Sequence, residues 1–228
     1  MVKTYAIILA SGTGNRFGSN LPKQFTKIEG KTILEYSIEA FEKSDLIDKI
    51  VLIIAPDYID KARSIITSNK YKKVCKILAG GKTRKESSFI GINAIPDTEA
   101  NVLIHDCARP FVSQNIIASC VNALKSYNAI TVGIPSTDTI IKVKDNIIED
   151  IPNRSELIRV QTPQGFKLSL IKAAHELTKN DNSYTDDCGI IFRNKLAQIH
   201  VIEGCNQNIK ITYPEDIIFA KEIIKNLH

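Results

Sequence analysis

The sequence of 228 residues lacks the features that mark membrane and secreted proteins. It contains no apolar run near the roughly 18 residues that a membrane helix requires, so we expect no membrane span. The segment Met1–Tyr5 leads directly into a strand-like stretch, without the longer apolar core and small-residue cleavage site of a signal peptide. These absences predict a cytoplasmic protein.

The sequence also lacks a cysteine framework and a basic tract. Its five cysteines are scattered without C-x-x-C spacing and its four histidines are dispersed, which favours reduced thiols over disulfides or a zinc site. The formal net charge is +5, but no block of Lys and Arg occurs. This charge suits a small polyanionic substrate, and we expect no nucleic-acid partner.

Four common nucleotide-binding or catalytic motifs are missing as well. The glycines Gly12, Gly14 and Gly18 are spaced one residue too widely for the dinucleotide motif G-x-G-x-x-G, and the P-loop string G-x-x-x-x-G-K-[ST] is absent. No Ser-His-Asp or Cys-His arrangement stands in a supporting motif. A site without a nucleophile–base pair acts by orienting reactants and stabilising phosphoryl charge.

The feature that points to such chemistry lies at the start of the chain. The apolar run Tyr5–Ala10 ends in a glycine loop that begins with Ser11 and contains Arg16, and Pro22-Lys23-Gln24 follows. A glycine loop after a strand brings backbone N–H groups close to phosphate oxygens. An isolated glycine pair is equally compatible with a surface turn, but Arg16 and Lys23 add the positive charge that a phosphate needs.

Alternation of strand-like and helix-like segments predicts an α/β domain spanning residues 1–228, with a mostly parallel sheet. In such sheets ligands bind at the carboxyl ends of the strands. A closing amphipathic helix is expected at Tyr213–Leu227, with Pro214 in its first turn. The expected strands are Tyr5–Ala10, Ile50–Ala55, Val74–Leu78, Val102–His105 and Ala129–Ile134, and further expected helices are Thr32–Phe41 and Asn115–Lys125.

One segment departs from this alternation. Thr139–Lys144 and Ile147–Ile151 read as two short strands around the turn Asp145-Asn146, which predicts a hairpin arm at about residues 137–158. An apolar hairpin is not stable alone, so we expect it to pack on a second copy in a homodimer. The alternative is a hairpin folded back on its own domain.

Five further clusters carry polar or charged residues. Each has a structural alternative: Asp106 as a helix cap, Arg109 and Arg154 in surface ion pairs, and Lys210 as a solvated lysine. As functional residues, Asp106 would hold Mg²⁺ and Arg109 a substrate phosphate. The clusters are Gly80–Ser87, Ile104–Pro110, Pro152-Asn153-Arg154, Gln161–Gln164 with Thr185-Asp186-Asp187, and Asn208–Thr212.

From Ala6 to about Ile224 the chain resembles the cytidylyltransferases that join CTP to a polyol phosphate. The resemblance implies a Rossmann-like nucleotidyltransferase fold with helices on both faces of the sheet. It also implies attack of the polyol phosphate on the α-phosphorus of CTP with release of pyrophosphate. The motifs that carry it, in the family's order, are Ser11-Gly12-Thr13-Gly14-x-Arg16 with Pro22-Lys23-Gln24, His105-Asp106-x-x-Arg109-Pro110, Gln161-Thr162-Pro163-Gln164, Thr185-Asp186-Asp187 and Asn208–Thr212.

The resemblance also implies residue roles. Arg16 and Lys23 would stabilise the α-phosphate, Lys210 and Arg154 would position the attacking phosphate, and Asp106 would lie near Mg²⁺. Arg154 would reach from the arm into the neighbouring subunit's site. The residues implied for the nucleotide are Ala10, Ser11, Gly12, Gly14, Gly80, Gly81, Arg84 and Ser87, and those implied for the polyol phosphate are Arg109, Thr139, Thr162 and Thr185.

Two positions depart from the family pattern, and both the acceptor and the functional class have an alternative. Ser11 and Cys107 stand where the family commonly has alanine or glycine, and both are small enough to fit. Residues 151–155 and Asp187-Cys188 resemble ribitol 5-phosphate enzymes of wall or capsule synthesis, whereas Ala108 resembles the 2-C-methylerythritol 4-phosphate enzymes of isoprenoid synthesis. The sequence slightly favours ribitol 5-phosphate. A catalytically silent nucleotide-binding protein on this fold is the other class.

Overall fold

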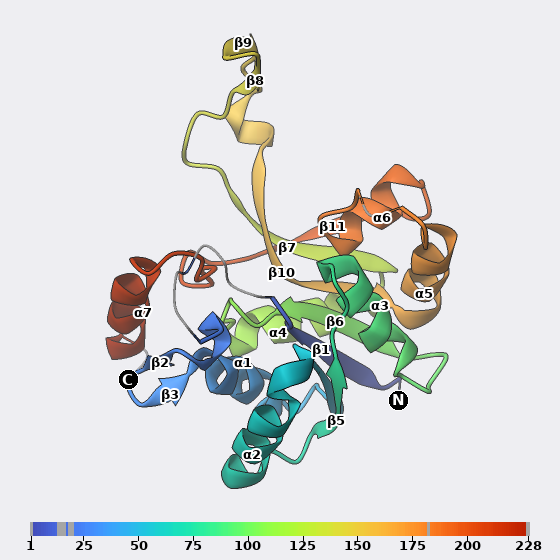
Figure 1. Cartoon of the computed structure of the whole chain (residues 1–228). Coiled ribbons are helices and arrows are strands. Elements are labelled where there is room, and N and C mark those ends of the chain that lie inside the picture. Colours follow the sequence, from blue (N-terminus) through green and yellow to red (C-terminus); the bar gives the residue numbers. More distant parts are fainter. Residues whose placement is uncertain (1, 13–16, 18–20, 182, 227–228) are drawn as a thin grey trace.

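A computed structural model of the chain describes residues 2–12, 17, 21–181 and 183–226. Its centre is a seven-stranded sheet with the order β11-β7-β10-β6-β1-β4-β5 (Figure 1). All neighbours are parallel except β10, which lies antiparallel between β6 and β7. The bounds are β1 (Thr4–Ala10), β4 (Lys49–Ile54), β5 (Val74–Ala79), β6 (Asn101–Asp106), β7 (Ala129–Pro135), β10 (Ile158–Lys167) and β11 (His200–Glu203).

Helices cover both faces of this sheet, as predicted. Successive residues of β1 alternate between the two faces, so Ile8 joins one buried cluster and Ile7 the other. This burial on both sides explains why the parallel strands are almost continuously apolar. One face packs against α1 (Ile33–Glu42), α2 (Ile59–Asn69), α4 (Gln114–Ala123) and α7 (Asp216–Lys225), and the other against α3 (Arg84–Asn93), α5 (Leu168–Leu177) and α6 (Asp187–Arg193).

The predicted strands and helices are confirmed, with small shifts at their ends. Helix α1 begins after Thr32, which forms a reciprocal capping box with Glu35. Helix α7 differs from the prediction, because it begins at Asp216 and Pro214 lies in the turn before it. The Asp216 carboxylate accepts hydrogen bonds from the backbone N–H groups of Thr212 and Tyr213, which closes that turn ahead of the helix.

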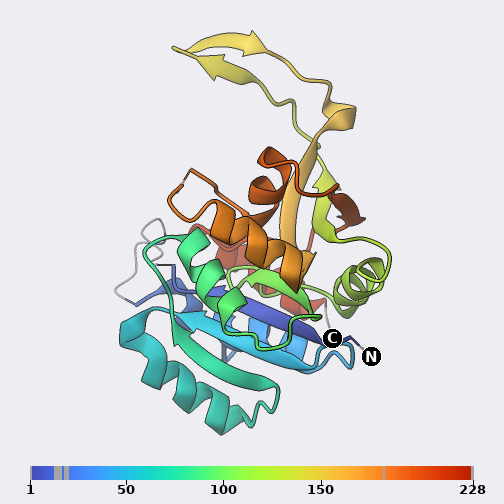
Figure 2. The same cartoon turned by 90° about the vertical axis from the view of Figure 1, so that its right-hand side faces the viewer.

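The hairpin lies at the predicted position and stands away from the body in both views (Figures 1 and 2). Strands β8 (Lys142–Lys144) and β9 (Ile147–Asp150) pair antiparallel, and Asp145 and Asn146 have φ values of 51° and 63°. Positive φ at both turn residues is the signature of a tight type I′ hairpin. We call residues 136–157 the arm; it includes the short helix η4 (Arg154–Glu156).

The arm exposes apolar side chains, so the fold-back alternative is wrong for this chain. Ile147 is 70% exposed, and Ile148 and Ile151 are each more than half exposed. The arm is continuous with the sheet at its base, because β7 leads into it and β10 leads out of it.

Three small elements lie near the start of the site. The 3-10 helix η2 (Lys23–Phe25) precedes a two-stranded sheet of β2 (Lys27–Ile28) and β3 (Lys31–Thr32), and η3 (Pro56–Tyr58) follows β4. Phe25 is buried in the same cluster as α1. Among the described residues, no helix has the length and apolar character needed to span a bilayer.

Candidate active site

A pocket of about 680 Å³ opens at the carboxyl ends of β1, β5 and β6. This is the edge of a parallel sheet at which ligands are expected. Backbone from the loops after β1 and β5 forms one wall, and charged side chains from α3, β6 and the chain after β11 form another. The pocket brings together ten of the predicted site residues, namely Ala10, Ser11, Gly12, Lys23, Gly80, Gly81, Arg84, Ser87, Asp106 and Lys210.

The wall built from Gly80 and Gly81 admits no side chain. A Cβ atom at Gly80 would fall on the side chain of Ser11, and one at Gly81 would fall on Cβ of Glu86. The hydroxyl of Ser87 accepts from the N–H of Gly81 at 3.1 Å and donates to the carbonyl of Thr83 at 2.9 Å. The hydroxyl of Ser87 is also in hydrogen-bond contact with the hydroxyl of Ser11. Because Ser87 gives its only proton to the carbonyl of Thr83, Ser11 is the donor in this contact.

Helix α3 directs its N-terminus toward the pocket. Thr83 is its N-cap and accepts a hydrogen bond from the backbone of Glu86. The first turn carries Arg84 and Ser87, and Thr83 also lines the pocket. The partial positive charge of a helix N-terminus favours an anionic ligand at this wall.

Lys23 and Gln24 are tied to two separate parts of the site. The Nζ of Lys23 donates to the carbonyl of Ile211 at 2.8 Å, and the buried amide of Gln24 donates to the carbonyl of Ala10 at 2.7 Å. These bonds hold η2 against the end of β1 and against the chain beside Lys210. The predicted site residues Gly14 and Arg16 lie outside the described residues.

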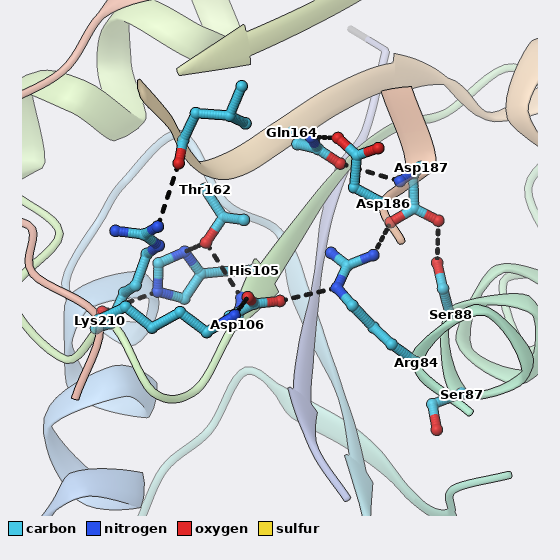
Figure 3. Close-up of polar contacts among 12 residues, drawn as sticks. Arg84, Ser87, Ser88, His105, Asp106, Thr162, Gln164, Asp186, Asp187 and Lys210 are labelled. Carbon is cyan, nitrogen blue, oxygen red and sulfur yellow. Dashed lines mark hydrogen bonds and ion pairs between the residues drawn. The ribbon is translucent and has the colours of Figure 1, made fainter. Parts of the chain in front are cut away.

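Asp106 lies between two cations at the end of β6 (Figure 3). Its Oδ1 accepts from Nε of Arg84 at 3.0 Å, and its Oδ2 accepts from Nζ of Lys210 at 2.7 Å. Burial opposes ionisation of Asp106, but the charges of Arg84 and Lys210 outweigh it and hold the pKa of this carboxyl well below its usual range. The site therefore presents one fixed negative charge between two positive ones.

A buried hydrogen-bond chain supports Asp106 from behind. Its backbone N–H donates to Oγ1 of Thr162 at 3.1 Å, and that hydroxyl lies 3.0 Å from Nδ1 of His105. Nε2 of His105 lies 2.9 Å from the carbonyl of Arg109, an acceptor, so this nitrogen carries the proton. Burial lowers the pKa of His105 to about 4, which keeps the ring neutral. Thr162 thus lies beside the site on β10, behind Asp106.

The donor set fits a magnesium ion held by one carboxylate and the phosphates of a nucleotide. Within the described ranges, no group of three or more His, Cys, Asp or Glu side chains is placed to hold a metal ion. Magnesium is commonly bound by only one or two carboxylates together with substrate phosphates. Asp106 lines the pocket, and each of its oxygens has one cationic partner and a further lone pair.

Besides Thr162, four predicted residues that the structure describes do not line the pocket of the single chain. Thr139 and Arg154 are exposed on the arm, where Arg154 donates to the carbonyl of Thr137, and Thr185 is exposed in the loop before α6. Arg109 lies next to the site, and its guanidinium donates to the carbonyls of Asn208 and Val160. Their predicted roles with the polyol phosphate remain predictions.

The sequence analysis placed Asp187 in a motif without giving it a role, and it did not single out His175. Asp187, the first residue of α6, accepts a hydrogen bond from Nη1 of Arg84 at 2.7 Å, and His175 lies behind it. The signal for α6 was present, because Asp186 precedes a helical apolar run and caps the helix. Nothing in the local sequence links Asp187 to Arg84.

Comparisons with known proteins agree with this geometry. The family model of 2-C-methyl-D-erythritol 4-phosphate cytidylyltransferase matches residues 4–226. Among curated relatives bearing that name, the one from Clostridium botulinum is 39% identical over 100% of both chains. The one from Thermobifida fusca is 36% identical over 96% of this chain and 92% of its own.

Solved structures give the same answer. The crystal structure of 4-diphosphocytidyl-2C-methyl-D-erythritol synthase from Anaerococcus prevotii superposes with a TM-score of 0.86 at 32% identity, covering 98% of this chain and 96% of that one. The seven-stranded sheet and its helices are thus those of a nucleotidyltransferase, as the sequence predicted. Full-length similarity and an intact pocket together show that the chain belongs to the 2-C-methyl-D-erythritol 4-phosphate cytidylyltransferase family and is a CTP-dependent nucleotidyltransferase.

Proposed function

We propose that the enzyme transfers CMP from CTP to 2-C-methyl-D-erythritol 4-phosphate, giving a CDP-polyol and pyrophosphate. The observation that carries this choice of acceptor is the match of that family's model to residues 4–226. Relatives at 39% identity over the full length carry the same name. These comparisons outweigh the local features near residues 151–155 and Asp187-Cys188, so the slight preference for ribitol 5-phosphate is corrected here.

The nucleotide occupies the wall formed by the two loops after β1 and β5. Side chains are excluded at Gly80 and Gly81, so the nucleotide would approach the backbone there and that of neighbouring Ser11. A pocket lined closely by backbone suits a pyrimidine and would be overfilled by a purine. The start of α3 adds donors at the same wall.

The transfer itself needs charge more than covalent chemistry. An oxygen of the acceptor phosphate attacks the α-phosphorus of CTP, a new P–O bond forms, and the bond from the α-phosphorus to the β-phosphate oxygen breaks. The electron pair leaves with pyrophosphate. Lys23, with Arg16, stabilises the negative charge at the α-phosphate, a contribution typically worth ~3–4 kcal/mol per donor. Lys210 holds the attacking phosphate.

Asp106 has two tasks in this scheme. It orients Lys210 through the 2.7 Å ion pair, and it offers the carboxylate for a magnesium ion. Magnesium bound there would neutralise phosphate charge as the transfer proceeds. Gln24 supports the same end of the pocket by fixing η2 to the carbonyl of Ala10.

The functional unit in this proposal is a homodimer joined through the arm. The arm exposes five isoleucines and Val143, and it also carries Arg154 and Thr139. Burying this apolar surface against a second copy would remove it from water and bring Arg154 to the partner's pocket. The pocket of one chain, which Arg154 does not line, would be completed in this way.

The decisive test is pyrophosphate release from CTP and magnesium with each acceptor in parallel. We expect release with 2-C-methyl-D-erythritol 4-phosphate and little with D-ribitol 5-phosphate, and the CDP-polyol should be identified by mass. Turnover only with ribitol 5-phosphate would overturn the acceptor assignment while leaving the cytidylyltransferase chemistry in place. CTP binding without turnover of any polyol phosphate would favour the silent nucleotide-binding alternative.

A further inference from the structure

The buried carboxylate of Asp187 lies behind the pocket and is linked to it through Arg84 (Figure 3). Its Oδ2 accepts from Nη1 of Arg84 at 2.7 Å, while Nε of the same guanidinium donates to Asp106 at 3.0 Å. Arg84 therefore bridges two carboxylates, one behind the pocket and one within it. The guanidinium of Arg84 is therefore held on one side by Asp187 and on the other by Asp106.

Asp187 is itself held by partners from three elements. Its Oδ1 accepts from the hydroxyl of Ser88 at 2.6 Å and lies 2.9 Å from Nε2 of His175. Its backbone N–H donates to the side-chain carbonyl of Gln164, which lies on β10. Because α3, α5 and β10 all contribute, Asp187 is an immobile anchor.

The charges alternate from this anchor to the solvent side of the pocket. Asp187 is negative, Arg84 positive, Asp106 negative and Lys210 positive. Burial opposes ionisation of Asp187, but the charge of Arg84 prevails and lowers the pKa of Asp187 to about 2. Removal of the Asp187 carboxylate would leave Arg84 with one counter-charge instead of two. Arg84 would then be free to shift, and the positions of Asp106 and Lys210 would shift with it.

We propose that Asp187 is a positioning residue that sets the location of Lys210 by acting through Arg84 and Asp106. The proposal rests on the role of Lys210 given under the proposed function. The proposal also assigns a role to α6, which follows the loop that contains Thr185. Through Asp187 this helix is bonded to Arg84 and Ser88 of α3, the helix beside the proposed nucleotide wall. The sides of the site that serve nucleotide and acceptor are thereby held at a fixed separation.

The first test is substrate-independent and uses the wild-type protein. A guanidinium held at both Nε and Nη1 does not rotate freely, so the ¹⁵N spectrum should show two separate Nη signals for Arg84. The Arg84→Lys variant serves only to assign these signals. One averaged Nη signal in the wild type would overturn the proposal, whether or not any variant folds.

The second test compares Asp187→Asn with Ser88→Ala. Both changes affect the same buried carboxylate, but only the first removes its negative charge and with it the ion pair to Arg84. For Asp187→Asn we expect kcat/KM for the acceptor to fall roughly 10- to 100-fold and the Nη signals to merge. CTP binding by calorimetry should change much less. For Ser88→Ala we expect a lower Tm with separate Nη signals and near-normal kcat/KM.

The outcomes separate this proposal from the assigned acceptor. If the wild type turns over another polyol phosphate, the kinetic comparison is made with that one, and the acceptor assignment alone fails. Equal losses of kcat/KM in both variants, in proportion to their losses in Tm, would show a purely structural role for Asp187. Full activity in a folded Asp187→Asn variant would also overturn the proposal.

Discussion

The hydroxyl oxygens of Ser11 and Ser87 lie 2.8 Å apart and join the loop after β1 to the first turn of α3. Gly80 fills the remaining space beside this pair. A Cβ at Gly80 would meet the side chain of Ser11 first, with Oγ at 2.6 Å, and Oγ of Ser87 next at 3.0 Å. The nearest atom is Cβ of Ser11, so any residue other than glycine at position 11 requires a glycine at position 80.

The first prediction is that Gly80→Ala weakens CTP binding and that Ser11→Gly restores it. The added methyl group must displace Ser11, which costs about 1–3 kcal/mol as for other overpacked sites. Calorimetric titration with CTP should show the loss in Gly80→Ala and a partial recovery in the double variant. Absence of recovery would mean that Ser11 is not the obstructing residue.

A second glycine provides the control for folding. Among the atoms of the described residues, none lies within 4 Å of a Cβ placed at Gly12, so Gly12→Ala should keep the wild-type Tm. A drop in Tm at Gly12 as large as that at Gly80 would contradict the steric argument.

The second prediction concerns Lys23. Lys23→Met should reduce kcat by roughly 10²- to 10³-fold, because it removes one of the cations that the proposed mechanism places at the transition-state phosphate. The Arg16→Ala variant should behave in the same way. Steady-state pyrophosphate release measures the effect, and Tm should remain within the range of well-tolerated substitutions.

Lys172, exposed on α5, offers the matched control for charge removal. Lys172→Met makes the same change in net charge and should leave kcat unaltered. Near-normal turnover in Lys23→Met would remove this residue from the mechanism, whereas equal losses at both positions would indicate a general effect of charge.

The third prediction tests whether Arg154 acts on the partner's site. Lys23→Met and Arg154→Ala should each be nearly inactive alone. When equal amounts are mixed and allowed to exchange subunits, half of the dimers are mixed and each of these contains one intact site. Activity should then recover to about a quarter of the wild-type value by this symmetry argument. No recovery after confirmed exchange would place Arg154 in the site of its own chain.

The fourth prediction concerns the pH dependence of stability. An ordinary histidine in the unfolded chain has a pKa of about 6.5, whereas buried His105 has a pKa of about 4. Below pH 6.5 the unfolded chain therefore binds a proton that the folded chain does not. Stability from this group is complete above pH 6.5 and declines as the pH falls toward 4, by about 2 kcal/mol between pH 7 and pH 5.

Urea unfolding of the wild type and His105→Gln across pH 5–7 measures this slope. The variant should be less stable at pH 7 and should show a shallower decline. This range lies above the unfolded pKa of aspartate, so the depressed pKa values of Asp106 and Asp187 contribute little to the slope. The same slope in both proteins would show that His105 is not the titrating group.

The sequence indicated the core of the fold because its parallel strands are continuous Val, Ile and Leu runs. It did not indicate β10, whose ten residues include Pro163 and Gly165, residues that normally argue against a central strand. The structure accommodates Pro163 where the pairing with β7 shifts register between Gln161 and Gln164. Edge strand β11 was missed because four residues give too short a pattern.

The residues of the site likewise fall into those that the sequence indicated and those that it did not. Residues that stand in local motifs, such as Gly80, Asp106 and Lys210, were found because each motif follows a strand or turn that the sequence announces. The pairing of Arg84 with Asp187 joins positions 103 residues apart, and only the tertiary fold brings them together. The hydrogen bond of Gln24 to Ala10 was missed for a different reason, since a single amide side chain has no sequence signature of its own.

The strand order also constrains the sequence of events during synthesis of the chain. In the described sheet, β7 and β11 are joined to the other strands by the pairing of β7 with β10. Strand β10 is synthesised after the whole arm. Until then β6 and β7 emerge as two unpaired edges with a gap one strand wide between them. The wall with Gly80 can form from the first half of the chain, whereas Thr162, Asp187 and Lys210 arrive with the last. Such long sequence separations slow folding, and the site is complete only after β10 has paired and the chain beyond β11 has brought Lys210 into place.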